Sequence, residues 1–323
     1  MAKLSYFVAA CFVAAALFAN PSEAQHVYVS KDGDDVNSCV QVSPCKTFQR
    51  AHAVAGGSYP IIVCVDNSDF KIVTITRSIT IDCTAAGGMI QTGQTAVTIN
   101  GAGIIVELRG LRLRGLAAGN IGVNFQSGSA LYLDGLHISG FRGGATSAGV
   151  YFAPVASTVG ELHLTDTTIN DNGSGDTGGG VLIVPQSGAI ANVSILRAKV
   201  QNNSFGIAAL GLSSGGGMRV SIVDTISSGA VNSGIVASSA ITPFNMTLSN
   251  VVAANNGTIG VISDGSGGKI RMGGSTVTGN QTFGVLTSLG GSLLTMRNNI
   301  VVANGNDGTP LTAFPGPGGA PLQ

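Results

Sequence analysis

The stretch "LHLTDTTINDN" (Leu162 to Asn172) and the stretch "VSILRAKVQNN" (Val193 to Asn203) follow one template. Each has apolar residues at alternate positions, then a bend residue, then a second short strand that ends at Asn. Six more segments repeat it: "VELRGLRLRG" from Val106, "LYLDGLHISG" from Leu131, "VSIVDTISSGA" from Val220, "MTLSNVVAANN" from Met246, "IRMGGSTVTGN" from Ile270 and "LTMRNNIVVAN" from Leu294. A third short strand with a leading Gly lies between segments, at Gly122, Gly149, Gly180, Gly206, Gly234, Gly260 and Gly284. Three short strands per repeat of 24 to 31 residues predict an all-β, right-handed parallel β-helix.

Two polar columns within the repeats have structural explanations. The bend position holds Gly110, Gly135, Asp166, Arg197, Asp224, Asn250, Gly274 and Asn298. All but Arg197 are Gly, Asn or Asp, the residues that best tolerate a left-handed backbone. The strand-end position holds Asn172, Asn203, Asn256, Asn280 and Asn304, whose stacked amides are expected to bond from coil to coil. Most of the acid and amide residues around Leu164 to Gly180 therefore belong to the scaffold.

The segment before the repeats is expected to close the N-terminal end. "SPCKTFQRAHAVAGG" (Ser43 to Gly57) has apolar residues at helical spacing and a Gly-Gly stop, which predicts a short amphipathic capping helix. A cap is needed because an open β-helix exposes unpaired strand edges. The expected layout is a signal peptide at 1–24, the cap and first coils at 25–95, the repeats at 96–308, and a flexible Pro/Gly tail at 309–323.

The first residues are typical of a secretory signal. Lys3 is followed by an apolar run (Tyr6 to Ala19) and a small-x-small cleavage site that ends at Ala24. We expect a secreted or periplasmic protein with no transmembrane span after cleavage, and an uncleaved anchor is the alternative. The formal net charge is zero, with 10% charged residues, so no partner nucleic acid or anionic membrane surface is expected.

Four cysteines remain after the signal peptide is removed: Cys39, Cys45, Cys64 and Cys83. An even number in an exported chain favours disulfides, and the spacings are not those of a zinc site. Three pairings are open. We favour Cys39–Cys45, which closes a short loop, and Cys64–Cys83, which would join neighbouring strands.

The chain can be placed in a superfamily by resemblance. "VYVSKDGDDVNSCVQVSPCKTFQRAHAVA" (Val27 to Ala55), followed by "ITRSITIDC" and the Gly- and Asn-rich coils, resembles secreted bacterial right-handed β-helix repeat proteins of the pectin-lyase-like superfamily. That superfamily includes polysaccharide lyases and hydrolases as well as non-catalytic adhesins. The resemblance implies the fold and leaves the chemistry open.

The resemblance also implies where a lyase cleft would lie, on the outer face of the Gly-initiated strands. Alternation predicts the outward residues there as Asn124, Tyr151, Leu182, Ala208, Val236, Ile262 and Leu286. None is charged, so the carboxylates and the base of a calcium-dependent lyase are missing from that face. The row instead forms an aliphatic stripe, which is expected to meet a partner or a second copy of the chain, or to be covered by a loop or the tail.

The strongest polar cluster falls on the early coils. Its members are Glu107, Arg112, Arg114, Tyr132, His137 and His163. All six are candidates for binding an acidic sugar, and His163, His137, Tyr132 and Arg112 are the catalytic candidates, with Tyr or His as base and Arg stabilising an enolate. The alternative is an ordinary solvated face whose charges pair across coils.

No cofactor is expected, and calcium is the one metal to weigh. Asp32, Asp34 and Asp35 are the candidate ligands, but the loop lacks the Gly and the terminal Glu of an EF-hand. We interpret this loop as a solvated turn held by the cysteines.

Three functional hypotheses follow. The leading one is an exported, non-catalytic scaffold that acts at a surface or binds an extracellular polysaccharide. The second is a polysaccharide lyase acting on acidic glycans through the His/Tyr/Arg cluster. The third is a structural or self-associating protein that forms a homo-oligomer through the aliphatic stripe.

Overall fold

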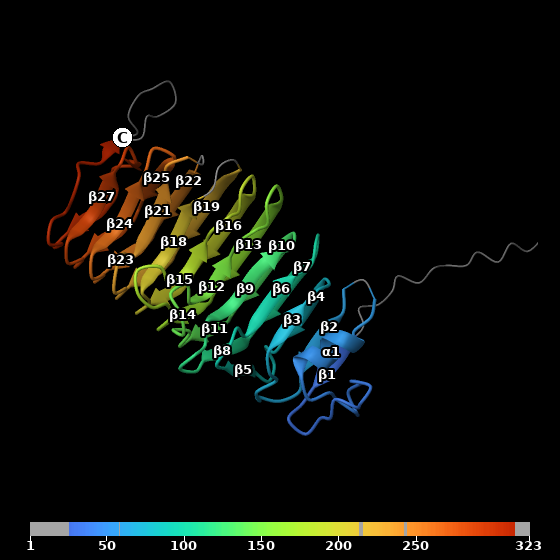
Figure 1. Ribbon diagram of the computed structural model, residues 1–323. Coiled ribbons are helices and arrows are strands. Elements are labelled where there is room, and N and C mark those ends of the chain that lie inside the picture. Colours follow the sequence, from blue (N-terminus) through green and yellow to red (C-terminus); the bar gives the residue numbers. More distant parts are fainter. Residues whose placement is uncertain (1–25, 58, 213–215, 242–243, 314–323) are drawn as a thin grey trace, which may run out of the picture.

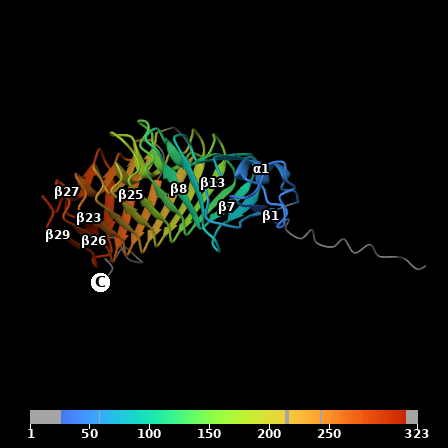
Figure 2. The same ribbon diagram turned by 90° about the horizontal axis from the view of Figure 1, so that it is seen from below.

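Three parallel sheets wind into a right-handed solenoid along one axis (Figure 1). The computed structural model describes residues 26–57, 59–212, 216–241 and 244–313. The expected signal peptide and the last ten residues of the chain lie outside these ranges. In each complete coil the chain passes through the first, second and third sheets in turn. Figure 2 shows the coils stacked side by side, with α1 (Phe48–Val54) at one end and the strands β27 and β29 at the other.

Each sheet collects one strand from successive coils, and their order follows the chain. The first sheet contains β1 (His26–Val29), β2 (Ile61–Cys64), β4 (Ile79–Asp82), β7 (Ile105–Arg109), β10 (Ala130–Asp134), β13 (Val159–Thr165), β16 (Ile190–Leu196), β19 (Gly217–Val223), β22 (Phe244–Ser249), β25 (Gly268–Gly273), β28 (Ser292–Thr295) and β30 (Thr312–Ala313). The second contains β5 (Gly88–Thr92), β8 (Leu111–Gly115), β11 (His137–Ser139), β14 (Thr168–Asn170), β17 (Lys199–Gln201), β20 (Ile226–Ser228), β23 (Val252–Ala254), β26 (Thr276–Thr278) and β29 (Ile300–Val302). The third contains β3 (Val73–Ile75), β6 (Val97–Asn100), β9 (Ile121–Ser127), β12 (Ala148–Phe152), β15 (Gly179–Ile183), β18 (Phe205–Gly211), β21 (Ile235–Ser239), β24 (Ile259–Asp264) and β27 (Phe283–Ser288). The expected β-helix with three strands per coil is confirmed.

The core follows from alternation along each strand. Leu133, Leu164 and Ile195 pair in register across β10, β13 and β16, and all three are buried. Each such aliphatic side chain contributes roughly 1.5–3 kcal/mol by leaving water. Because coils stack roughly 4.8 Å apart, every inward position becomes a continuous apolar column and every outward position a surface row.

The bend column is confirmed with one correction. Gly110, Gly135, Asp166, Arg197, Asp224, Asn250 and Gly274 all have φ between +49° and +63°. In the last coil, however, Arg297 has the positive φ of 67°, and Asn298 does not. The last repeat begins one residue earlier than predicted, because Ile270 pairs with Leu293, and an extra turn residue restores the register before β29.

Arg197 and Arg297 are the exceptions in this column, and at Arg197 the preceding coil compensates for the strain. A non-Gly residue in the left-handed region costs roughly 1–2 kcal/mol. The Arg197 guanidinium donates two hydrogen bonds of 2.7 Å to the Asp166 carboxylate one coil away. Arg197 thereby lowers the pKa of Asp166. Both side chains are half exposed, so this pair offsets only part of the strain.

The asparagine column forms a buried ladder with one gap. Asn280 Oδ1 accepts from the backbone N–H of Asn256 at 3.0 Å and from its side-chain Nδ2 at 2.8 Å, and Asn304 receives the same two bonds from Asn280. Asn172 and Asn203 form an equivalent pair. Ala230 occupies the intervening position, and its N–H donates to Asn256 Oδ1 at 3.0 Å. The expected coil-to-coil amide bonding is therefore present in two runs.

Both favoured disulfides are present in the structure. Cys39–Cys45 closes the loop beside β1, and Cys64–Cys83 joins the ends of β2 and β4. A Cβ at Gly88 would lie 2.5 Å from the Cys83 sulfur, so this bridge requires glycine there.

The predicted cap is a helix, but it is shorter than expected. It spans Phe48–Val54, with Thr47 as N-cap accepting from the N–H of Arg50, and it lies against β1, β2 and β3. His52 is buried and accepts a 3.2 Å hydrogen bond at Nε2 from the Thr76 N–H. Burial, and to a lesser extent Arg77, lowers the pKa of His52.

The C-terminal boundary also differs from the expectation. Residues 312–313 were expected in the flexible tail, yet they form β30, which pairs with β28. The first sheet thus extends past the last complete coil.

Candidate functional site

Half of the predicted polar cluster lies in one row on the first sheet. Glu107, Tyr132 and His163 pair in register on β7, β10 and β13. The rings of Tyr132 and His163 stack with centroids 4.6 Å apart and planes 6° apart. The pair presents a partly exposed aromatic surface, since 37% of Tyr132 is accessible. Glu107 is engaged by Arg109, whose Nε donates to Oε1 at 2.7 Å.

The other half lies on the second sheet. His137 pairs with Arg112, and Ser139 pairs with Arg114. His137 Nε2 hydrogen-bonds Asn170 Oδ1 at 2.8 Å. Within the described ranges, no hydrogen bond, ion pair or ring contact joins these residues to Tyr132 or His163. An elimination reaction needs its base and its enolate-stabilising group at the same sugar carbon, and no contact places Arg112 beside His163 for that role.

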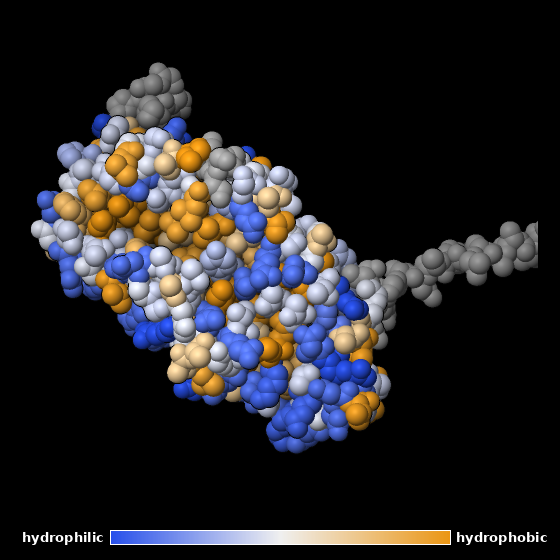
Figure 3. Space-filling view, in the orientation of Figure 1, coloured by the Kyte–Doolittle hydropathy of each residue, from blue (hydrophilic) through white to orange (hydrophobic). Residues whose placement is uncertain are grey.

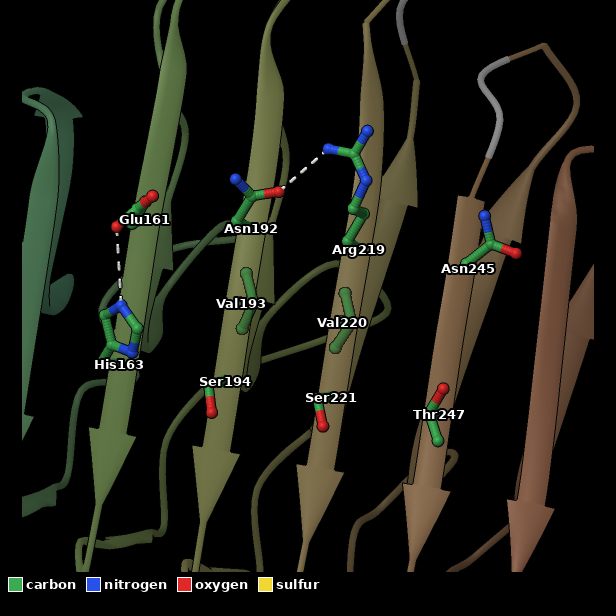
Figure 4. A pocket seen from close by; sticks show the side chains of 10 residues that line it. All are labelled: Glu161, His163, Asn192, Val193, Ser194, Arg219, Val220, Ser221, Asn245 and Thr247. Atoms are coloured by element: carbon green, nitrogen blue, oxygen red, sulfur yellow. Dashed lines mark hydrogen bonds and ion pairs between the residues drawn. The ribbon is translucent and has the colours of Figure 1, made fainter.

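A shallow hollow of about 620 Å³ lies beside His163, over β13, β16, β19 and β22 (Figure 4). We call it the polar groove; its lining residues are Glu161, His163, Asn192, Val193, Ser194, Arg219, Val220, Ser221, Asn245 and Thr247. The polar members form two register rows. One row is Glu161, Asn192, Arg219 and Asn245, and the other is His163, Ser194, Ser221 and Thr247.

The polar side chains of the groove are linked along the β-helix axis. Arg219 donates to Asn192 Oδ1 at 3.2 Å, and Glu161 lies 3.7 Å from His163 Nε2 (Figure 4). One coil beyond, Arg271 donates to Asn245 Oδ1 at 3.0 Å. In the part of the chain that the structure describes, neither Arg219 nor Lys269 has a carboxylate within ion-pair distance. The groove therefore offers amides, hydroxyls and a guanidinium whose charge is not neutralised by a neighbouring acid.

His163 is the one groove residue among the candidates predicted from the sequence; the other nine were not predicted. The Glu161 row consists of the residue that immediately precedes each repeat segment: Glu161 before Leu162, Asn192 before Val193, Arg219 before Val220 and Asn245 before Met246. The sequence signal for this row is a polar residue one position before the first apolar residue of each repeat segment.

The aspartates weighed for calcium have protein partners. Asp35 accepts from the backbone N–H groups of Lys46 and Thr47, both at 2.9 Å, and thus holds the start of α1. Asp32 pairs with Lys31 at 2.7 Å. Asp34 accepts from the N–H of Val36 at 3.1 Å. No group of three or more metal-binding side chains occurs among the residues described.

The predicted aliphatic stripe is one register row on the third sheet. Tyr151, Leu182, Ala208, Val236 and Ile262 follow one another from coil to coil. Leu182, Ala208 and Val236 point outward by alternation, yet they are at most 9% exposed. They form a small cluster against which Val184, Phe205 and Leu210 pack, so neighbouring side chains of the third sheet account for much of this burial.

Comparison with known proteins bears on the fold. No family model matches the chain. No curated protein sequence matches it. Among solved structures, the crystal structure of pectate lyase Pel9A is similar, with a TM-score of 0.50, 11% identity, and coverage of 88% of this chain and 78% of that chain. The chain thus shares the parallel β-helix fold of this lyase, and at this identity the likeness concerns the fold alone. No helix in the described segments is long and apolar enough to cross a membrane.

Proposed function

We propose that this protein is an exported, non-catalytic β-helix scaffold that binds an extracellular polysaccharide along the polar groove. The observation that carries the proposal is the repetition of polar side chains, coil after coil, from β13 to β22. Because neighbouring coils are roughly 4.8 Å apart, an extended chain of similar units meets similar groups at regular steps. A linear polysaccharide is such a ligand.

The chemistry of the groove fits sugars. Asn192 and Asn245 offer amides, and Ser194, Ser221 and Thr247 offer hydroxyls, which both donate to and accept from sugar hydroxyl groups. The stacked rings of Tyr132 and His163 continue the row at one end and provide a flat surface for an apolar sugar face. Arg219 lines the groove, and Lys269 follows Asn245 in the same register row. Neither has a carboxylate within ion-pair distance among the described residues, which favours a glycan that carries carboxylate or sulfate groups.

Two further observations support an exported glycan-binding protein. The two disulfides fit an oxidising compartment. The likeness to a pectate lyase makes a polysaccharide a reasonable ligand class by analogy of fold. A lyase remains the alternative function, and the division of the predicted cluster between two sheets favours binding over catalysis.

The test measures retention and cleavage together. The chain from Gln25 onward is applied to an array of acidic and neutral polysaccharides, and unsaturated products are followed by absorbance with and without calcium. We expect retention on acidic glycans without product. Arg219→Gln should weaken binding about tenfold, because it removes a charge-assisted contact. Lys199→Gln, on the second sheet away from the groove, is the matched control and should bind normally.

Two outcomes would overturn the proposal. Absence of retention on every glycan would refute polysaccharide binding. Product release that His163→Ala abolishes would replace the binding function by the lyase.

A further inference from the structure

A second site lies on the third sheet, away from the polar groove. A slot of about 230 Å³ runs along the aliphatic stripe over β15, β18, β21 and β24. We call it the apolar slot; its apolar lining is Leu182, Phe205, Ala208, Leu210, Val236 and Ile262. Figure 3 shows these strands as the place where apolar residues gather on this face of the molecule. The slot is thus a depression whose floor is formed by the sparsely exposed residues of the stripe.

One wall of the slot is the loop 173–178 between β14 and β15. The Gly175 carbonyl accepts hydrogen bonds from Ser204 Oγ and from Asn232 Nδ2, the second at 3.3 Å. Ser204 and Asn232 belong to the next two coils. The loop therefore lies flat on the surface and runs along the β-helix axis. Asp176 and Thr177 consequently line the slot. The loop holds the wall in place by specific bonds.

The charged groups at the slot are all acidic. Asp176 and Asp264 are the only charged residues among those that line it, within the described chain. Asp264 accepts from the hydroxyls of Ser238 and Ser288, and neither of these partners is a cation. No hydrogen bond or ion pair to the Asp176 side chain is found among the described residues. Two carboxylates without a basic neighbour beside an apolar surface attract an occupant that is both apolar and positively charged.

The dimensions of the slot select the kind of occupant. Its volume is below the roughly 300–1,000 Å³ of pockets that enclose whole small-molecule ligands. It is suited to a few anchoring side chains of a larger partner. From Leu182 to Ile262 the slot crosses three coil steps, roughly 14 Å, which an extended peptide covers in about four residues.

We infer that the apolar slot docks an extended peptide segment of a partner protein, which inserts aliphatic side chains over Ala208 and Val236 and places Lys or Arg beside Asp176 and Asp264. This interaction is independent of the proposed glycan binding, because it uses a different sheet. The partner class is set by the combination of an apolar floor and an acidic rim.

Three occupants from this chain itself fit less well. A two-fold dimer through the slot would face its own carboxylates with the same carboxylates. The most exposed aliphatic side chain of the described ranges, Val42, lies in a segment (31–46) with three aspartates against two lysines. The last ten residues, 314–323, contain no Lys or Arg. None of these supplies the positive charge that the rim requires.

The experiment titrates the chain from Gln25 onward with four capped peptides and follows binding by saturation-transfer NMR. The probes are acetyl-Lys-Leu-Leu-Lys-amide and versions with Gln or Glu in place of Lys, together with acetyl-Lys-Gly-Gly-Lys-amide. We expect the Lys-Leu peptide to bind about three- to fivefold more tightly than the Gln-Leu peptide, and the Glu-Leu peptide to bind worst. The Lys-Gly peptide should not bind, because it lacks the apolar anchors.

Two variants locate the binding. Ala208→Phe fills the floor of the slot and should abolish peptide binding while glycan retention persists. The double variant Asp176→Asn, Asp264→Asn leaves the floor intact and should remove the preference for Lys over Gln; it keeps the test valid if Ala208→Phe does not fold.

Three results would overturn the inference. They are no binding by any peptide, equal binding of the Lys and Glu peptides, and self-association that Ala208→Phe abolishes, which would assign the slot to a second copy. A failure of glycan retention with normal peptide binding would refute the proposed function and leave this inference standing.

Discussion

The polar groove and the apolar slot are built on the same coils and differ in almost every surface property. On the first sheet, the outward positions of β13 to β22 carry acid, amide, hydroxyl and guanidinium groups. On the third sheet, one outward row of β15 to β24 carries Leu182, Ala208, Val236 and Ile262. The inward positions of both sheets are buried in one continuous apolar core.

This contrast shows how the fold separates stability from recognition. Along each strand, one of every two successive side chains must fill the core, and the other points outward and is free to vary. Because the coils stack in register, outward residues at equivalent positions form a row. When several successive coils carry the same type of residue there, the row becomes a surface of one chemical character. Two surfaces with different partners can therefore share one scaffold.

The largest loss of stability is expected from disrupting the asparagine ladder, which lies in the scaffold that carries both surfaces. Asn280→Ala removes the acceptor of two bonds from Asn256 and the donor of bonds to Asn304 and to the Ala253 carbonyl. Because buried partners are left unsatisfied, we expect a loss of about 3 kcal/mol in the free energy of unfolding. Chemical denaturation measures it, and Asn120→Ala, at an exposed position, should change stability by less than about 0.5 kcal/mol. A similar loss for both variants would refute the structural role of the ladder.

A matched pair of substitutions tests the contrast directly. Val236 and Ser221 both point outward, but Val236 is 9% exposed and lies in the apolar slot. Val236→Asp places a carboxylate in an apolar, largely covered position and should destabilise the protein by about 2 kcal/mol. Ser221→Asp adds the same charge to the polar groove beside Arg219 and should change stability by less than about 0.5 kcal/mol. Thermal unfolding of the two variants provides the comparison, and equal losses would contradict it.

The aromatic end of the polar groove is expected to contribute less. Tyr132→Ala removes one of the two stacked rings and should weaken glycan binding about five- to tenfold, since such ring contacts contribute roughly 0.5–1.5 kcal/mol. Tyr132→Phe retains the ring and should bind nearly as the parent does. Affinity electrophoresis in a polysaccharide gel measures both. Loss of binding in Tyr132→Phe would show that the hydroxyl, and not the ring, contacts the ligand.

The smallest effect is expected for the pH dependence of stability, which we trace to His52 in the N-terminal capping helix. The pKa of His52 is lowered in the folded chain by burial, with Arg77 adding to it, while in the unfolded chain His titrates near 6.5. As the pH falls below about 6.5, the unfolded state takes up a proton that the folded state does not, so stability decreases. Above that pH both states are neutral at His52 and this contribution is constant. His52→Gln should reduce the dependence of the free energy of unfolding on pH, measured by denaturation between pH 7.5 and about 5. An unchanged dependence would rule out His52 as its source.

The architecture could be predicted from the amino-acid sequence, because the information that encodes it is local and is repeated in every coil. Alternation placed Tyr132 beside His163 and Leu182 beside Ala208, and the left-handed preference of Gly, Asn and Asp marked the bends. The pairing Cys64–Cys83 followed from neighbouring strands. Each of these predictions requires only that one coil stack on the next in register.

The sites could be located only in the three-dimensional structure, because the residues that come together there depend on turn lengths and on contacts between rows. One extra turn residue moved the last bend from Asn298 to Arg297. The separation of the first and second sheets divided His163 from His137, and Arg109 engaged Glu107. The insertion that carries Asp176 folded along the axis and walled the apolar slot. A repeat template describes what each coil has in common, whereas these features arise where a coil differs from its neighbours.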